Sequence, residues 1–408
     1  MLNFITGGVC AAQGFRAGGI HVGVKTHAAW KKDVALIVSD EDCACAAVYT
    51  KNAVKAAHIH VDKRHLADGK ARAAVINSGN ANACAPMGEE NAERVCAAAG
   101  KALGCRPEDV VVAATGVIGQ TLNVAVIEQG MPELCAAAAH TAAGSDAAAH
   151  AIMTTDTVKK ELAVETVIGG KTVRMGGIAK GSGMIHPNMG TMLCFLTTDC
   201  AISSEMIKSA LLETVQASFN RISVDGDTST NDTCCVLANG LAGNPVITEK
   251  GPDYDAFVEA LRALCVELAK KMASDGEGAT HLITCTVTGA GSEQSAETVA
   301  KSVIGSALTK AAIFGADANW GRVLCAIGYS GAPVDVGKID VQFASKAGTI
   351  LVCKDGAGVD FSEEEAKKIL LESEIEILID LHSGSAVSTA WGCDLTYDYV
   401  KINGDYRT

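Results

Sequence analysis

The sequence predicts a mixed α+β protein with more than one folding unit, and three observations support this. The chain has 408 residues, whereas an average domain has roughly 150. Its hydrophobic content of 48% is sufficient for large buried cores. Runs typical of strands and runs typical of helices both occur, but they do not alternate as βαβ units. Layered α+β architecture is therefore favoured over a doubly wound sheet.

In the first half of the chain, short apolar runs bounded by turn residues predict strands, and apolar residues at helical spacing predict helices. The expected elements are strands at 34–38, 73–76 and 110–113 and a helix at 89–103. The alanine-rich stretch 136–151, with Gly144 inside it, is expected to form two helical pieces. Alternating apolar residues on both sides of Gly169 and Gly170 predict a hairpin.

In the second half, a glycine-dense segment at 176–190 precedes an apolar strand. Ser362 and Glu365 form a Ser-x-x-Glu capping box at the start of a further helix. The remaining expected elements are strands at 192–196, 281–287 and 375–381 and a long amphipathic helix at 254–273. A domain boundary is expected near residue 280, between that helix and the next strand, which divides the chain into 1–280 and 281–408.

Composition excludes several function classes. The formal charge is 34 − 47 = −13, which argues against nucleic acid and anionic membrane surfaces as partners. The sixteen cysteines include no C-x-x-C pair, so reduced thiols are expected, with no metal site. We find neither a signal peptide nor an apolar run long enough to span a membrane, and expect a cytoplasmic protein.

The junction Gly190-Thr191 lies where the glycine-rich loop meets the apolar strand. A hydroxyl at this position can attack the preceding carbonyl and break the chain. The new N-terminal threonine then carries a nucleophile and a base together, since an α-amine with a pKa near about 8 is partly neutral at physiological pH. The small Gly190 leaves its carbonyl open to attack. On these residues alone, an ordinary loop followed by a buried strand is the simpler interpretation.

The segment KGSGMIHPNMGTML at 180–193 resembles the self-cleavage segment of the bacterial ornithine acetyltransferase family (glutamate N-acetyltransferase, ArgJ) of arginine biosynthesis. Other segments match that family in order along nearly the whole chain: INSGNANA at 76–83, ATGVIG at 114–119, MTTD at 153–156, DGEGAT at 275–280, ADANWGR at 316–322 and NGDYRT at 403–408. One departure is visible, because the family usually has alanine where this chain has Gly190.

The resemblance implies a layered α/β/β/α sandwich like that of N-terminal-nucleophile enzymes, with a smaller C-terminal α+β domain whose tail returns to the active site. It implies cleavage at Gly190-Thr191 into an α chain, 1–190, and a β chain, 191–408, assembled as an α2β2 heterotetramer. No cofactor is implied. The implied catalytic residues are Thr191 as the nucleophile and Thr115 and Gly116 as the oxyanion hole. The implied substrate-binding residues are Thr154, Lys180, Thr191, Glu277, Asn403 and Thr408.

The implied reaction is ping-pong transfer of acetyl from N2-acetylornithine to glutamate through acetyl-Thr191. Whether acetyl-CoA also donates stays open. Two alternatives remain: an N-terminal-nucleophile amidohydrolase or aminopeptidase on the same scaffold, and a non-enzymatic binding relative. The run VDGDTSTND, with Asp225, Asp227 and Asp232, is interpreted as a turn with capping aspartates rather than a calcium loop.

Overall fold

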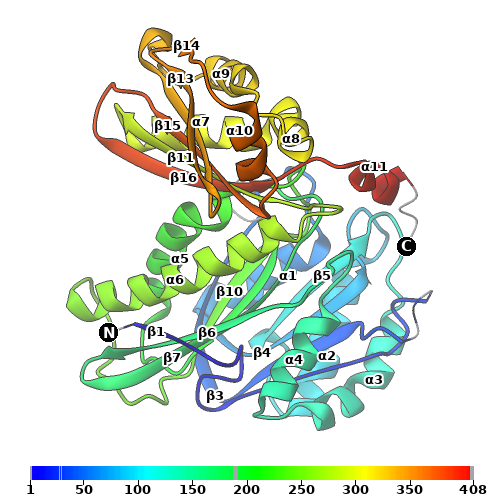
Figure 1. The fold of residues 1–408 in the computed structure, drawn as a ribbon. Helices are drawn as coiled ribbons and strands as arrows, with labels where there is room; N and C mark the ends of the chain where they lie inside the picture. The colour runs from blue at the N-terminus through cyan, green and yellow to red at the C-terminus, as the bar shows by residue number, and fades with distance from the viewer. Residues whose placement is uncertain (1, 27, 29, 187–191, 405–408) are drawn as a thin grey trace.

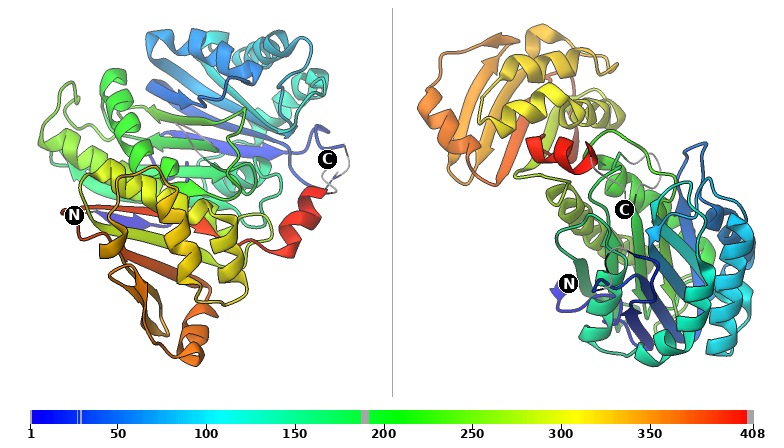
Figure 2. Two further views of the ribbon diagram at one scale, coloured as in Figure 1. Left: turned by 90° about the horizontal axis from the view of Figure 1, so that it is seen from above. Right: turned by 90° about the vertical axis from the view of Figure 1, so that its right-hand side faces the viewer.

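The computed structural model describes residues 2–26, 28, 30–186 and 192–404. Within these residues the chain forms two sheets with helices on their faces, so the predicted α+β class is confirmed (Figure 1). The right-hand view of Figure 2 shows two lobes, the smaller built mainly from the C-terminal third of the chain.

The larger, nine-stranded sheet has the order β1-β6-β7-β8-β10-β3-β4-β5, with β2 also paired to β3. Its strands are β1 (Asn3–Ile5), β2 (Phe15–Ile20), β3 (Val34–Tyr49), β4 (Lys70–Asn80), β5 (Val110–Val117), β6 (Lys160–Ile168), β7 (Lys171–Lys180), β8 (Leu193–Thr198) and β10 (Thr233–Ala238). The helices of this part are α1 (Ala57–His65), α2 (Gly88–Leu103), α3 (Val124–Ala137), α4 (Ala142–Ala151), α5 (Ser204–Ala217) and α6 (Pro252–Ser274).

Strand β3 folds this sheet into two layers. Its first half pairs with β2 and its second half pairs with β10, while β4 pairs with both halves across a register shift between Val38 and Cys43. The strand predicted at 34–38 was therefore too short. The apolar pattern ends at the polar run 39–42, which predicts the end of the strand. The strand nevertheless continues through these residues, with an irregularity in its pairing with β4.

Side-chain alternation shows how the two layers stack. On β8, Leu193 and Phe195 join a core that also contains Ile37 and Ile76 of the other layer. Cys194, on the opposite face of β8, packs in a second core with α5 and α6. A third core lies between the outer face of β3, β4 and β5 and the helices α1, α2 and α3. The order of layers is thus helices, sheet, sheet, helices, as the resemblance implied.

The alanine-rich stretch does contain two helical pieces, but they are not separated at Gly144. The break between α3 and α4 falls at 138–141. Gly144 instead lies in the first turn of α4, where its N–H donates to the Thr141 hydroxyl at 3.0 Å. The N-cap Thr141 therefore sets the start of α4. In the sequence, the nearby Gly144 resembles a helix break, although it lies inside the helix.

The smaller, seven-stranded sheet has the order β14-β13-β12-β15-β11-β16-β9. Its strands are β9 (Ile222–Ser223), β11 (Leu282–Ala290), β12 (Asp340–Ser345), β13 (Gly348–Lys354), β14 (Ala357–Gly358), β15 (Glu374–Asp380) and β16 (Ala386–Cys393). The later helices are α7 (Glu293–Gly305), α8 (Ala307–Phe314), α9 (Trp320–Gly328), α10 (Glu363–Leu370) and α11 (Tyr397–Gly404). Ser362 caps α10 through the Glu365 N–H, as its capping box predicted. Because β9 precedes residue 280 but pairs with β16, the two units are joined by a strand as well as by the chain.

Candidate active site

A cavity of about 150 Å³ lies in the larger unit, beside the C-terminal ends of β5 and β7. It is lined by Thr115, Gly116, Ile118, Thr154, Thr155, Lys180, Gly181, Gly183, Met184, Ile185, Met192, Leu193, Ser229, Thr230, Asn231, Asp232, Glu277 and Asn403. Six of the predicted catalytic and substrate-binding residues are therefore brought together: Thr115, Gly116, Thr154, Lys180, Glu277 and Asn403. Gly190, Thr191 and Thr408 lie outside the described residues, but Met192, the residue after Thr191, lines the same cavity.

Thr115 and Gly116 lie near the end of β5, against the parallel strand β4. Gly116 has φ +131°, and a Cβ at this position would lie 2.4 Å from the carbonyl carbon of Gly79. The backbones of β4 and β5 approach each other so closely at Gly116 that only glycine fits there. The Asn231 amide, which donates to the carbonyls of Ala81 and Ala114 at 2.6 and 2.7 Å, ties this turn to the neighbouring chain. The turn is thus held rigidly from two sides.

Lys180 reaches the cavity from the end of β7 and is only 7% exposed. Its ammonium lies 3.9 Å from Asp156 Oδ2, while Lys160 contacts Asp156 and Asp275 at 2.6 Å each. Burial lowers the pKa of Lys180. Burial alone would raise the pKa of Asp156, but Lys180 and Lys160 outweigh that effect and hold it well below its usual range. Among the described residues Lys180 is therefore a buried cation with one long ion pair, suited to a carboxylate from a ligand.

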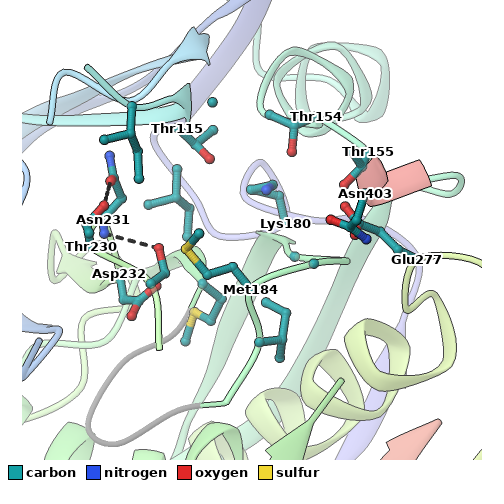
Figure 3. A pocket seen from close by; sticks show the side chains of 18 residues that line it. Thr115, Thr154, Thr155, Lys180, Met184, Thr230, Asn231, Asp232, Glu277 and Asn403 are labelled. Atoms are coloured by element: carbon teal, nitrogen blue, oxygen red, sulfur yellow. Dashed lines mark hydrogen bonds between the residues drawn. The ribbon is translucent and has the colours of Figure 1, made fainter. Parts of the chain in front are cut away.

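Glu277 and Asn403 meet at one side of the cavity, although 126 residues separate them (Figure 3). Asn403, on α11, donates its amide to Glu277 Oε2 at 2.7 Å. A Cβ on Gly183 would lie 2.4 Å from the Glu277 carboxyl group. Bare backbone at Gly183 therefore leaves the space in which this buried carboxylate sits, and the tail helix completes its surroundings.

Asp156, Asn231 and Asp232 were not selected as site residues from the sequence. Asp232 is 1% exposed, and among the described residues its Oδ2 has no hydrogen-bond partner. Burial raises its pKa well above the usual range. The turn interpretation fits Asp225, which accepts the N–H groups of Met184 and Ile185 at 2.6 and 2.9 Å, but Asp232 faces the cavity from the side opposite Glu277 (Figure 3). The sequence could not distinguish Asp232 from Asp225, because both lie near the same turn and the residue pattern does not show which aspartate is buried.

The described part of the chain contains no cluster of three or more histidine, cysteine or acidic side chains able to hold a metal ion. All sixteen cysteines are free. No helix among the described residues is long and apolar enough to cross a membrane.

Comparison with known proteins adds to this geometry. The model of the ArgJ family matches residues 16–408. The arginine biosynthesis bifunctional protein ArgJ of Symbiobacterium thermophilum is 50% identical over 408 residues, covering all of both chains. Its counterpart from Halalkalibacterium halodurans is 48% identical, over all of this chain and 98% of the relative. A crystal structure of ArgJ from Bacillus halodurans is 49% identical with a TM-score of 0.50, and the match covers 52% of this chain and 98% of that one.

Proposed function

The chain belongs to the ArgJ family and is an acetyltransferase of arginine biosynthesis, and from this premise we propose that it moves acetyl from N2-acetylornithine to glutamate through an ester on Thr191. The observation that carries the proposal is the convergence of Thr115, Gly116, Lys180 and Glu277 on one cavity, whose lining continues to the residue after Thr191.

In the first half-reaction the Thr191 hydroxyl attacks the acetyl carbonyl of N2-acetylornithine. Its proton passes to the Thr191 α-amine, which acts as general base. The amide C–N bond breaks, the proton moves to the departing amine, and ornithine leaves. In the second half-reaction the glutamate amine attacks the acetyl ester, N-acetylglutamate leaves, and the Thr191 hydroxyl is restored. Atoms balance without a cofactor, because an amide supplies the acetyl group.

Both half-reactions pass through a tetrahedral oxyanion, which the N–H of Gly116 and the hydroxyl of Thr115 would stabilise. Donors fixed before the reaction are effective because they need not reorganise as charge develops. The close contact of Gly116 with Gly79 and the hydrogen bonds of Asn231 provide that rigidity.

The charged residues of the cavity would recognise different groups of the substrates. Lys180 would bind the carboxylate that both substrates carry, which gives its buried charge a closer partner than Asp156 at 3.9 Å. Glu277 would receive the side-chain amine of ornithine, with Asn403 holding the carboxylate in place at 2.7 Å. Thr154 lines the cavity beside them, and Thr191 and Thr408 complete the proposed set.

We further propose that the active form arises by cleavage at Gly190-Thr191, and that the products assemble as α2β2. The solved chain from Bacillus halodurans supports the cleavage, since it matches only 52% of this chain while 98% of its own length is covered. The expected fragments have 190 and 408 − 190 = 218 residues. They would remain interleaved, because β7 and β8 pair across the junction.

Denaturing electrophoresis and mass spectrometry of freshly purified, active protein test the proposal. Two fragments of these lengths are expected, and Thr191→Ala should give a single chain without transfer activity. An active protein that runs only at full length would refute the mechanism. If the rate of acetate release without glutamate exceeds the rate of N-acetylglutamate formation with glutamate present, the protein is instead an amidohydrolase.

A further inference from the structure

Self-cleavage needs a proton acceptor that acetyl transfer does not need. In the processed protein the α-amine of Thr191 is the proposed base, but in the uncleaved chain that nitrogen belongs to the peptide bond with Gly190. An amide nitrogen is not basic, so another group must take the proton of the attacking hydroxyl. A proton must also reach the nitrogen that leaves Gly190. Both transfers require a titratable side chain in the cavity.

Three titratable side chains line the cavity among the described residues: Lys180, Asp232 and Glu277. Lys180 in its charged form has no acceptor, and the ion pair with Asp156 favours that form. Glu277 accepts the Asn403 amide at 2.7 Å, on the opposite side of the cavity from Asp232 (Figure 3). Asp232 is the remaining carboxyl group, and the proposed transfer reaction leaves it without a role.

The backbone holds Asp232 beside the start of β8. Asp232 directly precedes β10, which pairs in parallel with β8 so that Thr233 lies opposite Leu193. The Thr233 N–H donates to the Met192 carbonyl at 2.9 Å, and the Asp232 carbonyl accepts the Thr50 N–H at 3.1 Å. Asp232 is therefore a neighbour of Met192, the second residue of the proposed β chain.

The carboxyl group of Asp232 is buried and one of its oxygens is unpaired. Burial raises the pKa of Asp232 well above its usual range, although hydrogen bonds, one of them from the Met192 backbone N–H, act in the opposite direction. Its Oδ2 has no hydrogen-bond partner among the described residues. A neutral carboxyl group donates a proton at one oxygen and accepts one at the other. An unpaired buried oxygen does not stabilise the fold, so this arrangement favours a chemical role.

We propose that Asp232 is the proton-transfer group of self-cleavage at Gly190-Thr191. The inference rests on the proposed function, of which cleavage is a part. The Thr191 hydroxyl attacks the Gly190 carbonyl, and one oxygen of the neutral Asp232 carboxyl group takes the hydroxyl proton. The other oxygen gives its proton to the Thr191 nitrogen as the C–N bond breaks. An ester then joins Gly190 to the Thr191 side chain, and Asp232 is neutral again.

Water completes the cleavage. It attacks the ester carbonyl with the new α-amine of Thr191 as base, and the C–O bond breaks. The products are the Gly190 carboxylate and the free Thr191 hydroxyl, which is then available for acetyl transfer. Asp232 is thus needed in the step for which the chain has no α-amine.

Cell-free synthesis of the full chain tests the inference, because mass spectrometry can follow cleavage from the moment the precursor forms. Asp232→Asn keeps the shape of the side chain but is not an acid. It should slow the appearance of the 190- and 218-residue fragments by about 10²–10⁴-fold, and Asp232→Glu should recover part of the rate. Asp227→Asn is the matched control: it makes the same change at an exposed residue of the same run and should cleave like the wild type.

Two further measurements separate proton transfer from packing. Asp232→Ala leaves space in the cavity wall for a small planar molecule. Formate should accelerate cleavage of this variant at least about tenfold, whereas formamide, which has a similar shape but is not an acid, should not. Uncleaved Asp232→Asn should have the same urea midpoint as Thr191→Ala, since both are full-length chains and the carboxyl group is not needed for folding.

Cleavage of Asp232→Asn at the wild-type rate would overturn the inference and leave the proposed function standing. Equal acceleration of Asp232→Ala by formate and formamide would also overturn it, because the carboxyl group would then only fill space. So would a lowered urea midpoint in Asp232→Asn without rescue of Asp232→Ala by formate. If the wild type transfers acetyl but is never cleaved, the proposed Thr191 mechanism itself fails.

Discussion

Replacing Gly116 by alanine tests both the packing of the oxyanion turn and its proposed role. The new Cβ would lie 2.4, 2.6 and 2.7 Å from the Gly79 carbonyl carbon, the Asn80 nitrogen and the Gly79 oxygen. None of these is a flexible side-chain end, so β4 and β5 must separate locally. A side chain at positive φ costs about 1–2 kcal/mol, and overpacking adds about 1–3 kcal/mol. We expect Gly116→Ala to lose about 2–5 kcal/mol of unfolding free energy.

Gly119→Ala is the matched control, because it follows the same turn. Gly119 has φ +84°, and a Cβ added there would have no atom of another residue within 4 Å beyond its chain neighbours. Only the conformational cost of about 1–2 kcal/mol therefore applies. Urea unfolding of both variants gives the difference, which isolates the collision with Gly79.

Activity separates the packing argument from the catalytic one. Displacing an oxyanion donor lowers kcat by about 10²–10³, so Gly116→Ala should fall in that range and Gly119→Ala should remain within a few fold of the wild type. Should Gly116→Ala fail to fold, Thr115→Val removes the hydroxyl with little change of volume and should lower kcat by about 10². Equal stability of the two glycine variants would refute the steric reasoning. Wild-type kcat in Gly116→Ala and Thr115→Val would refute the oxyanion hole.

Three further predictions concern the charged residues. Asp156→Asn leaves Lys180 without its ion pair and should cost about 3–5 kcal/mol in urea unfolding at pH 7, together with a raised KM for glutamate. Because the folded-state pKa of Asp156 lies below its unfolded value near about 3.9, its stabilisation is present above that value and is lost as pH falls towards the folded pKa. The stability difference between wild type and Asp156→Asn should therefore stay nearly constant from pH 6 to about pH 4.5 and shrink as the pH falls below about 4, and a difference that stays constant down to about pH 3 would contradict the assignment. Gly183→Ala should push the Glu277 carboxylate aside and raise the KM for N2-acetylornithine more than fivefold, with little change in circular dichroism; an unaltered KM would remove Glu277 from the proposed site.

The sequence by itself predicted the types of most of the elements it addressed, because alternation and helical spacing are local properties of the chain. It predicted α10 from its capping box, the hairpin of β6 and β7, and a helix close to the bounds of α6. It erred where a local signal was ambiguous. The polar residues at 39–42 concealed the continuation of β3, and Gly144 concealed a helix start that Thr141 sets.

Only the tertiary structure decided which residues meet. Lys180 and Asn403 are 223 residues apart in the sequence and line one cavity. The burial of Asp156 and Lys160 in one charged network, and the burial of Asp232 in the cavity wall, leave no mark on the residue pattern. Motifs could identify the family because they preserve residue types in order. The electrostatics of the site could not be derived from them, because pKa values and ion pairs depend on distance and on desolvation, which arise when separate layers pack together.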